Sequence, residues 1–298
     1  MITNTNTDTD GWAHDSVHEM IPTALGTIHV RVGGRADGTP MVFWHSLLTT
    51  GSMWQYQYRH YAPTHRIVLI DAPGSGASAP LTSTITLEEC SECLLSILNA
   101  LRIDKCILVG NSWGAILATV FAAWHPERLI AAVAANGTAS AATILDKVVM
   151  GPVVALIGAY STSPNWLVRF ARSGLAGKTA KRTKPEFLDS FQSVLKENPK
   201  SVALQMKSIL LGRADTHAAL NTIATVPVLL IAGDEDRQFS VKAVEDLAEA
   251  IPGSTFIVLP QTGHLSARES PELFNNAVDD FLADRALAAR PERTRPCG

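Results

Sequence analysis

The stretch from Cys106 to His125 reads C-I-L-V-G-N-S-W-G-A-I-L-A-T-V-F-A-A-W-H. An apolar run from Ile107 to Val109 is followed by a glycine-bounded turn and then by an alanine-rich segment with helical character. This order predicts a strand, a sharp turn and a helix. When a side chain stands at the tip of such a turn, the residues two positions before and after it must be glycine or nearly as small. A Cβ at those positions would collide with the strand or the helix. Gly110 and Gly114 meet that need on either side of Ser112.

The turn also gives Ser112 a chemical setting. The backbone N–H of Trp113 opens the expected helix, where the helix dipole favours negative charge on a substrate carbonyl oxygen. Ser112 is therefore a candidate nucleophile with half of an oxyanion hole beside it. The G-x-S-x-G pattern is short enough to arise by chance, and a strand end with a surface serine is the alternative interpretation. The flanking strand and helix favour the nucleophile.

Length and composition describe an ordinary globular chain. Its 298 residues suit one large α/β domain with an insertion, or two small domains. Apolar residues make up 46% of the chain and charged residues 18%, which supports a sizeable core and excludes a disordered profile. The net charge of -3 provides no overall basic field, so neither nucleic acid nor an anionic membrane is expected as a partner.

Targeting and redox signals are weak in this sequence. The first residues are polar and lack the apolar core of a signal peptide. No apolar run approaches the ~20 residues of a membrane span, so we expect a cytoplasmic protein without a membrane partner. Cys90 and Cys93 form a C-x-x-C without a second pair or a nearby histidine pair. We therefore expect them to pack in the core, and we expect no metal site.

Strands and helices alternate along most of the chain. The apolar runs that predict strands are 28–32, 41–44, 66–70, 107–109, 129–135, 226–232 and 255–259. Helices are expected between them, including one over 86–101 that begins with a capping box of Thr86 and Glu89. The alternation predicts a mostly parallel sheet with helices on both faces. In such sheets ligands bind beyond the carboxyl ends of the strands.

The alternation stops between about residues 137 and 221, where four helical stretches but no strand can be traced. These stretches are 142–160, 164–173, 185–197 and 199–211. We expect them to form a helical cap over the carboxyl edge of the sheet, lining a pocket with apolar side chains and limiting water. The expected domain plan is a flexible leader at 1–18, a core of 19–136 and 222–289, a cap at 137–221 and a tail at 290–298.

The expected cap contains a basic segment that has no acidic residue between positions 169 and 184. Its cations are Arg169, Arg172, Lys178, Lys181, Arg182 and Lys184. We interpret them as a solvated face. The sharper alternative is a positive field that favours an anionic substrate.

Two late strand ends carry the partners that a reactive serine requires, a base and a carboxylate that orients it. His264 follows the last predicted strand and is the candidate base. Asp236 follows the strand before it and is the candidate acid, because its turn reads G-x-x-D; Asp234 on the same turn is the alternative. The order Ser, Asp, His is that of G-x-S-x-G hydrolases. His14 and His18 are expected in the leader, and His29, His60, His65, His125 and His217 at the surface or at helix ends.

Five motifs in a fixed order resemble the α/β-hydrolase superfamily over roughly residues 20–285. They are H-S-L-L-T-T-G-S-M-W (45–54), D-A-P-G-S-G-A-S (71–78), G-N-S-W-G (110–114), G-D-E-D (233–236) and T-G-H (262–264). The chain is similar to the small capped esterases and lactonases with an H-G-x oxyanion loop. The resemblance implies an α/β-hydrolase fold, with a mostly parallel sheet of the eight-stranded type, flanking helices and an all-helical cap.

The resemblance also implies a role for each matching residue. Ser112 would be the nucleophile, Asp236 the acid and His264 the base, and the backbone N–H groups of Leu47 and Trp113 would form the oxyanion hole. One departure concerns this loop, because Ser46 stands where many relatives have glycine. The loop also resembles that of enol-lactonases, which have a comparable serine.

Four side chains are candidates for contacts with substrate. They are His45, Ser46, Asn111 and Trp166. Trp166 belongs to the expected cap, where packing inside the cap itself is the alternative role.

Together these features predict a serine hydrolase that cleaves a carboxylic ester or lactone through an acyl-enzyme, without a metal or cofactor. Serine at position 112 argues against haloalkane dehalogenases and epoxide hydrolases, which need a carboxylate nucleophile. Carbon–carbon bond hydrolases, aminopeptidases, perhydrolases and haloperoxidase-like enzymes use the same triad and stay open, as does a receptor with little turnover. We expect a small-molecule substrate and a monomer or homodimer.

Overall fold

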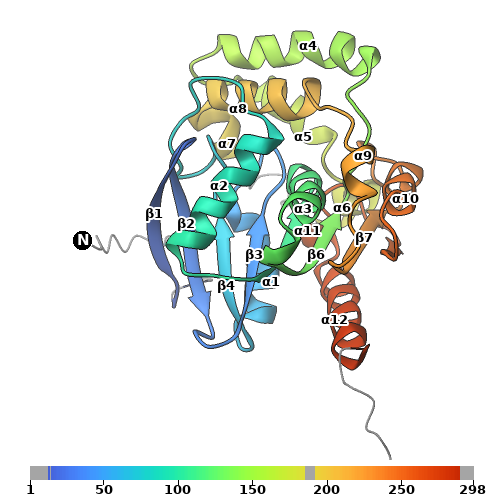
Figure 1. The fold of residues 1–298 in the computed structure, drawn as a ribbon. Helices are drawn as coiled ribbons and strands as arrows, with labels where there is room; N and C mark the ends of the chain where they lie inside the picture. Colours follow the sequence, from blue (N-terminus) through green and yellow to red (C-terminus); the bar gives the residue numbers. More distant parts are fainter. Residues whose placement is uncertain (1–12, 14, 185–191, 289–298) are drawn as a thin grey trace, which may run out of the picture.

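The computed structural model describes residues 13, 15–184 and 192–288 (Figure 1). The expected tail at 290–298, most of the expected leader and residues 185–191 of one expected cap helix lie outside the described residues.

The centre of the molecule is an eight-stranded sheet in the order β1-β2-β4-β3-β5-β6-β7-β8. The strands are β1 (Val17–Thr23), β2 (Gly26–Gly34), β3 (Thr39–Trp44), β4 (His65–Ile70), β5 (Cys106–Asn111), β6 (Leu129–Ala135), β7 (Val228–Gly233) and β8 (Thr255–Leu259). Only the pairs β1–β2 and β2–β4 are antiparallel, and the other neighbours run parallel. The expected mostly parallel sheet of the α/β-hydrolase fold is confirmed.

The first strand was not predicted. β1 begins inside the expected leader and pairs with β2 from Val17 opposite Val32 to Thr23 opposite Gly26. Within β1 only Ile21 is buried, and Met20 beside it is 52% exposed. An edge strand with one buried side chain has no alternating apolar pattern, so its pairing with β2 leaves no clear signal in the sequence.

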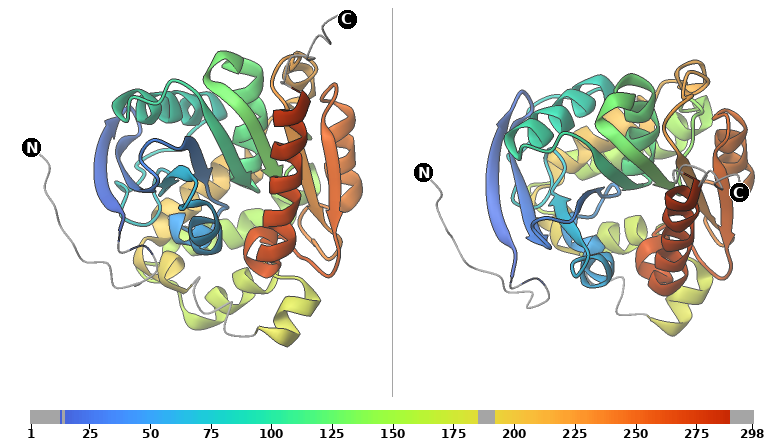
Figure 2. Two further views of the ribbon diagram at one scale, coloured as in Figure 1. Left: turned by 90° about the horizontal axis from the view of Figure 1, so that it is seen from below. Right: turned by 60° about the horizontal axis from the view of Figure 1, so that its bottom comes forward.

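Helices cover both faces of the sheet, as Figure 2 shows. On one face lie α2 (Leu87–Ala100), α3 (Trp113–Trp124) and α10 (Val241–Glu249); on the other lie α1 (Gln55–Tyr61) and α12 (Pro271–Ala288). The capping box at the start of α2 is confirmed, because Thr86 Oγ1 accepts from Glu89 N at 3.1 Å and Glu89 Oε2 accepts from Thr86 N at 2.8 Å. Cys90 and Cys93 are free and buried in the core, as expected.

In the described part of the segment expected to form the cap, every regular element is a helix. Its elements are α4 (Ile144–Ala159), α5 (Asn165–Ser173), α6 (Lys178–Thr183), α7 (Gln192–Glu197), α8 (Pro199–Gln205), the π-helix η4 (Met206–Leu211) and α9 (His217–Leu220). In Figure 1 α4 forms the outermost layer, above α8 and α5. None of the helices in the described ranges has both the length and the apolar character needed to cross a membrane.

Candidate active site

Ser112 lies on the sharp turn between β5 and α3 and is buried. Its backbone has φ 55° and ψ -109°, outside the regions that a non-glycine residue normally occupies. A Cβ on Gly110 would lie 2.0 Å from the carbonyl oxygen of Gly114, and a Cβ on Gly114 would lie 2.0 Å from that of Trp44. These distances confirm the prediction that both flanking positions must lack a side chain.

His264 and Asp236 meet beyond the ends of β8 and β7. The His264 Nδ1 atom lies 2.8 Å from Asp236 Oδ2, and both side chains are almost fully buried. Asp236 Oδ1 accepts the backbone N–H of Gln238 at 2.7 Å and that of Phe239 at 3.2 Å, and Asn136 Nδ2 donates to Oδ2 at 2.9 Å. The carboxylate therefore fixes Nδ1 of the imidazole and leaves Nε2 for a reacting group.

Electrostatics keep the Asp236 carboxyl group ionised. Burial alone would raise the pKa of Asp236, but the charge of His264 and the hydrogen bonds from His264, Gln238 and Asn136 outweigh it and hold the pKa below its usual value. Asp234, the alternative acid, lies on the same turn but accepts the backbone N–H of Thr262 at 3.1 Å. The geometry therefore favours Asp236 over Asp234 as the partner of His264.

Ser112 and His264 line one pocket, which has a volume of about 80 Å³. Leu47 and Trp113, the expected oxyanion donors, line it from the side of the sheet. The cap contributes an apolar wall of Met150, Val153, Leu175, Met206, Ile209 and Leu210. Within the described ranges no group of three or more His, Cys, Asp and Glu side chains is arranged to hold a metal ion.

The loop after β3 carries the expected oxyanion donor Leu47. The positive φ of this loop falls on Leu48, at 63°, and not on Ser46. A serine therefore fits at this position, because the backbone at position 46 does not need glycine's freedom. The Ser46 hydroxyl is buried, its residue lines the pocket, and it has no hydrogen-bond partner among the described residues.

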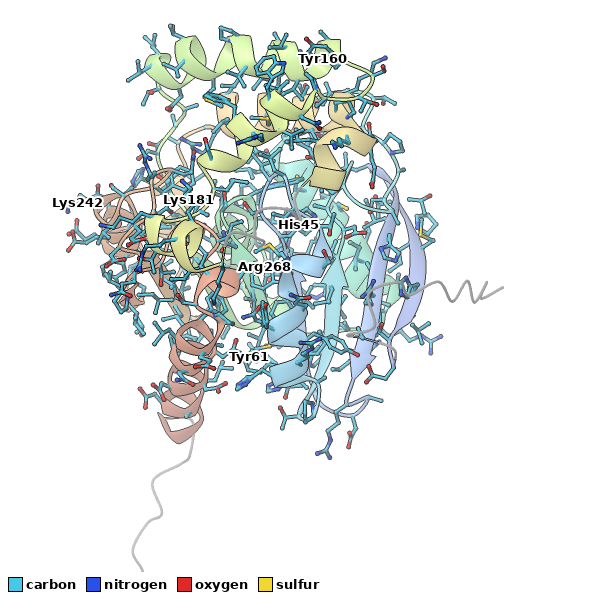
Figure 3. The ribbon with its side chains drawn as sticks, turned by 180° about the vertical axis from the view of Figure 1, so that it is seen from behind. His45, Tyr61, Tyr160, Lys181, Lys242 and Arg268 are labelled. Atoms are coloured by element: carbon cyan, nitrogen blue, oxygen red, sulfur yellow. The ribbon has the colours of Figure 1, made fainter. Side chains whose placement is uncertain are left out.

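His45 braces this loop from the interior, where Figure 3 labels it. Its Nε2 accepts the backbone N–H of Ala72 at 2.9 Å, and its Nδ1 donates to the carbonyl oxygen of Ser46 at 2.7 Å. Burial lowers the pKa of His45, although the Ser46 carbonyl and the charge of Asp71 act to raise it. The His45 side chain therefore supports the backbone at Ser46 and Ala72, and it is not among the described residues that line the pocket.

Two more candidates for substrate contact, Asn111 and Trp166, are not among the described residues that line this pocket, so their contact with substrate stays a prediction. Asn111 is buried, and its Nδ2 donates to the carbonyl oxygen of His264 at 3.0 Å. Trp166 is 57% exposed on α5, because that helix turns Leu167 and Val168 inward. Of the four candidates, only Ser46 is among the described residues that line the pocket.

His29, expected at a surface or helix-end position, is buried. Its Nδ1 lies 2.8 Å from Asp71 Oδ2, and the other Asp71 oxygen accepts the backbone N–H of Gly51 at 2.8 Å. Asp71 thus ties β2 to the start of the helix that follows the oxyanion loop. The sequence around His29 could not predict this contact, because its partner Asp71 lies 42 residues away in the chain.

In the basic segment, the side chains of Arg169, Lys178, Arg182 and Lys184 are exposed. Lys178 Nζ lies 3.9 Å from Glu235 Oε1, Lys184 Nζ donates to the carbonyl oxygen of Glu269 at 3.0 Å, and Lys181 Nζ donates to that of Ser173. None of these three lysines lines the pocket. These contacts favour the solvated face over a field acting on substrate.

Glu269 was missed by the sequence reasoning, although it connects the cap to the loop of His264. Its Oε2 accepts the backbone N–H groups of Gly177 at 3.0 Å and Gly263 at 2.9 Å, and its Oε1 accepts that of Leu265 at 3.0 Å. Burial raises the pKa of Glu269, and the three backbone donors and the charge of His264 offset part of that effect. Both residues that flank His264 in the chain are thus held by one carboxylate.

Replacing Glu269 with glutamine is expected to lower the free energy of unfolding by about 2 to 4 kcal/mol. The glutamine side chain has only one oxygen for the three backbone N–H groups that Glu269 accepts. At least one of these buried N–H groups would therefore face the glutamine NH₂ group, which is itself a donor. The measurement is urea denaturation, with Glu272→Gln on the exposed start of α12 as the matched control. Equal stability of the two variants would contradict a supporting role for Glu269.

Comparisons with known proteins agree with this architecture. Residues 41–277 match the family model described as "Alpha/beta hydrolase family". A 3-oxoadipate enol-lactonase 1 of Acinetobacter baylyi is 28% identical, with 86% of this chain and 93% of the relative covered. A second enol-lactonase of that organism is 26% identical over 84% of this chain and 90% of its own length.

Solved structures give the same result at the level of the fold. A hydrolase from Pseudomonas aeruginosa superimposes with a TM-score of 0.81 at 25% identity, with 89% of this chain and 98% of that chain covered. An enol-lactonase from Burkholderia xenovorans gives a TM-score of 0.81 at 23% identity, covering 89% of this chain and 100% of its own.

Proposed function

Because the chain belongs to the alpha/beta hydrolase family, we propose that it is a serine hydrolase that cleaves a carboxylic ester or lactone through an acyl-enzyme. The observation that carries this proposal is the His264–Asp236 pair, joined at 2.8 Å, on the pocket that Ser112 also lines. The similarity to two 3-oxoadipate enol-lactonases supports the choice of ester or lactone over other hydrolysed bonds.

In the proposed mechanism Ser112 Oγ attacks the substrate carbonyl carbon while His264 Nε2 takes the hydroxyl proton. Asp236 holds the imidazole in the required tautomer and stabilises its charged form. The backbone N–H groups of Leu47 and Trp113 stabilise the oxyanion, and the position of Trp113 at the start of α3 adds the field of the helix. His264 then protonates the leaving oxygen, and a water molecule activated by His264 releases the acid.

The test is to trap the acyl-enzyme. We expect p-nitrophenyl butyrate to give steady release of p-nitrophenol, and rapid acid quenching to leave a butyryl group on the peptide that contains Ser112. Mass spectrometry of the digested protein locates the group. Parallel assays with lactones of graded ring size then rank the ester and lactone activities.

Other outcomes would replace the proposal. Binding of the ester without turnover would favour a receptor on the same fold. Turnover of amides, β-diketones or peracids in preference to all esters and lactones would favour an aminopeptidase, a carbon–carbon bond hydrolase or a perhydrolase. We also propose from the sequence that the protein is cytoplasmic, that it is a monomer or homodimer, and that it needs no cofactor. Cell fractionation tests the location, and light scattering tests the oligomeric state.

A further inference from the structure

Arg213 lies beside the pocket that contains Ser112 and His264, just after the π-helix η4. Apart from His264, the other described residues that line this pocket have uncharged side chains. A permanent positive charge at the wall of a mostly apolar pocket is costly unless a partner group compensates it. The guanidinium therefore needs an explanation.

The contacts of Arg213 hold the guanidinium near the reacting groups. Its Nε donates to the carbonyl oxygen of Ser140 at 2.7 Å, and its guanidinium carbon lies 5.4 Å from the ring centre of Phe239. The Phe239 ring in turn lies 5.6 Å from the ring of His264. One aromatic ring thus separates the guanidinium from the candidate base, and the side chain is oriented without help from a carboxylate.

Among the described residues no acid forms an ion pair with Arg213. Burial lowers the pKa of Arg213, and the charge of Asp146 acts to raise it. Asp146 is engaged in the capping box of α4, where its Oδ2 accepts the backbone N–H of Thr143 at 2.8 Å. An arginine stays protonated at neutral pH in such surroundings.

A second cavity adjoins the pocket at the same residue. It has a volume of about 540 Å³ and shares Arg213, Ile116 and Ile209 with the pocket of Ser112. Arg213 therefore forms part of the wall of both cavities. The exposed Lys207 lines this second cavity but not the pocket of Ser112.

We propose that Arg213 binds a carboxylate of the substrate, so that the preferred substrates are esters or lactones that carry a second, ionised acid group. This inference rests on the proposed function and names its substrate class. A planar guanidinium pairs with a carboxylate through two parallel hydrogen bonds, which both strengthens binding and fixes the orientation of the substrate. The recognised group is thus a carboxylate carried on an apolar linker.

The test uses pairs of esters that differ in one charge. One pair is the p-nitrophenyl half ester of adipic acid and its methyl-capped neutral counterpart, assayed by release of p-nitrophenol. The other pair is the acetate ester of 6-hydroxyhexanoic acid and of its methyl ester, assayed by release of acetate. The two pairs place the acid on the acyl side and on the alcohol side of the reacting ester.

We expect the wild-type enzyme to have a higher kcat/KM for the charged member of at least one pair. Arg213→Gln is expected to lower that preference about 10- to 100-fold, mainly through KM of the charged ester, while Arg213→Lys retains part of it. The neutral esters report on folding, because damage to the fold lowers both members of a pair alike. Lys207→Gln is the matched control and should leave the preference unchanged.

Two results would overturn the assignment of Arg213. One is a wild-type enzyme with no preference for the charged member of either pair. The other is an Arg213→Gln variant that retains the full preference. In both cases Ser112-dependent turnover of the neutral esters would leave the proposed function intact, whereas absence of that turnover would count against the serine mechanism itself.

Discussion

Replacing Ser112 with alanine is expected to lower kcat for a p-nitrophenyl ester by about 10⁵- to 10⁶-fold. The change removes the attacking oxygen and leaves the rest of the site in place. The residual rate should stay above that of the uncatalysed reaction, because the expected oxyanion donors and the pocket still bind the ester. Steady-state assays of purified protein at neutral pH measure the loss.

Alanine should fit the turn as serine does. Neither side chain is branched at Cβ, and Ser112 already occupies its unusual backbone conformation with φ 55°. We therefore expect the thermal midpoint of Ser112→Ala to stay close to that of the wild type. Ser83→Ala, at an exposed position before α2, is the control for activity. A Ser112→Ala variant that retains a hundredth or more of the wild-type rate would exclude this serine as the nucleophile.

The strand–turn–helix at Ser112 was predictable because its signals are local. Gly110 and Gly114 are required because a Cβ at either position would lie 2.0 Å from a backbone oxygen, that of Gly114 or that of Trp44 in β3. The same restriction applies wherever a side chain is held at this kind of tip. β1 gave no such signal. Its partner β2 supplies the hydrogen bonds, and a segment with one buried side chain shows no periodicity in the sequence.

The positions of Asp236 and His264 at strand ends were predictable for a topological reason, since the carboxyl ends of parallel strands meet at one edge of the sheet. The choice between Asp234 and Asp236 depended on which carboxylate reaches His264 and which one reaches Thr262, and that is decided by the turn geometry. Contacts of the cap could not be foreseen. The outward position of Trp166 and the inward position of Arg213 both result from how cap helices pack.

Asp236→Asn is expected to lower kcat by about 10⁴-fold at neutral pH, the scale seen when the orienting acid of a triad becomes an amide. The contacts of Asp236 dictate how the amide must sit. Oδ1 accepts two backbone N–H groups, from Gln238 and Phe239, so the amide oxygen stays there. The NH₂ group then faces His264 Nδ1 and donates to it. The imidazole proton moves to Nε2, and that nitrogen can no longer accept the proton of Ser112.

Stability should change in a pH-dependent way in the same variant. The pKa of folded Asp236 lies below that of the unfolded chain, so the carboxylate contributes stability above the unfolded pKa of about 4 and loses it as the pH falls through the folded pKa. Asp236→Asn removes that contribution. The difference in unfolding free energy between wild type and variant should therefore shrink on acidification, as measured by urea denaturation at a series of pH values.

Asp234→Asn is the matched comparison, because it makes the same chemical change on the same turn. The amide oxygen can still accept the backbone N–H of Thr262, so kcat should fall by less than about threefold. The two variants together separate an orienting role from a general need for charge at this turn. An inactive Asp234→Asn with an active Asp236→Asn would reverse the assignment, and it would require the turn after β7 to rearrange so that Asp234 reaches His264.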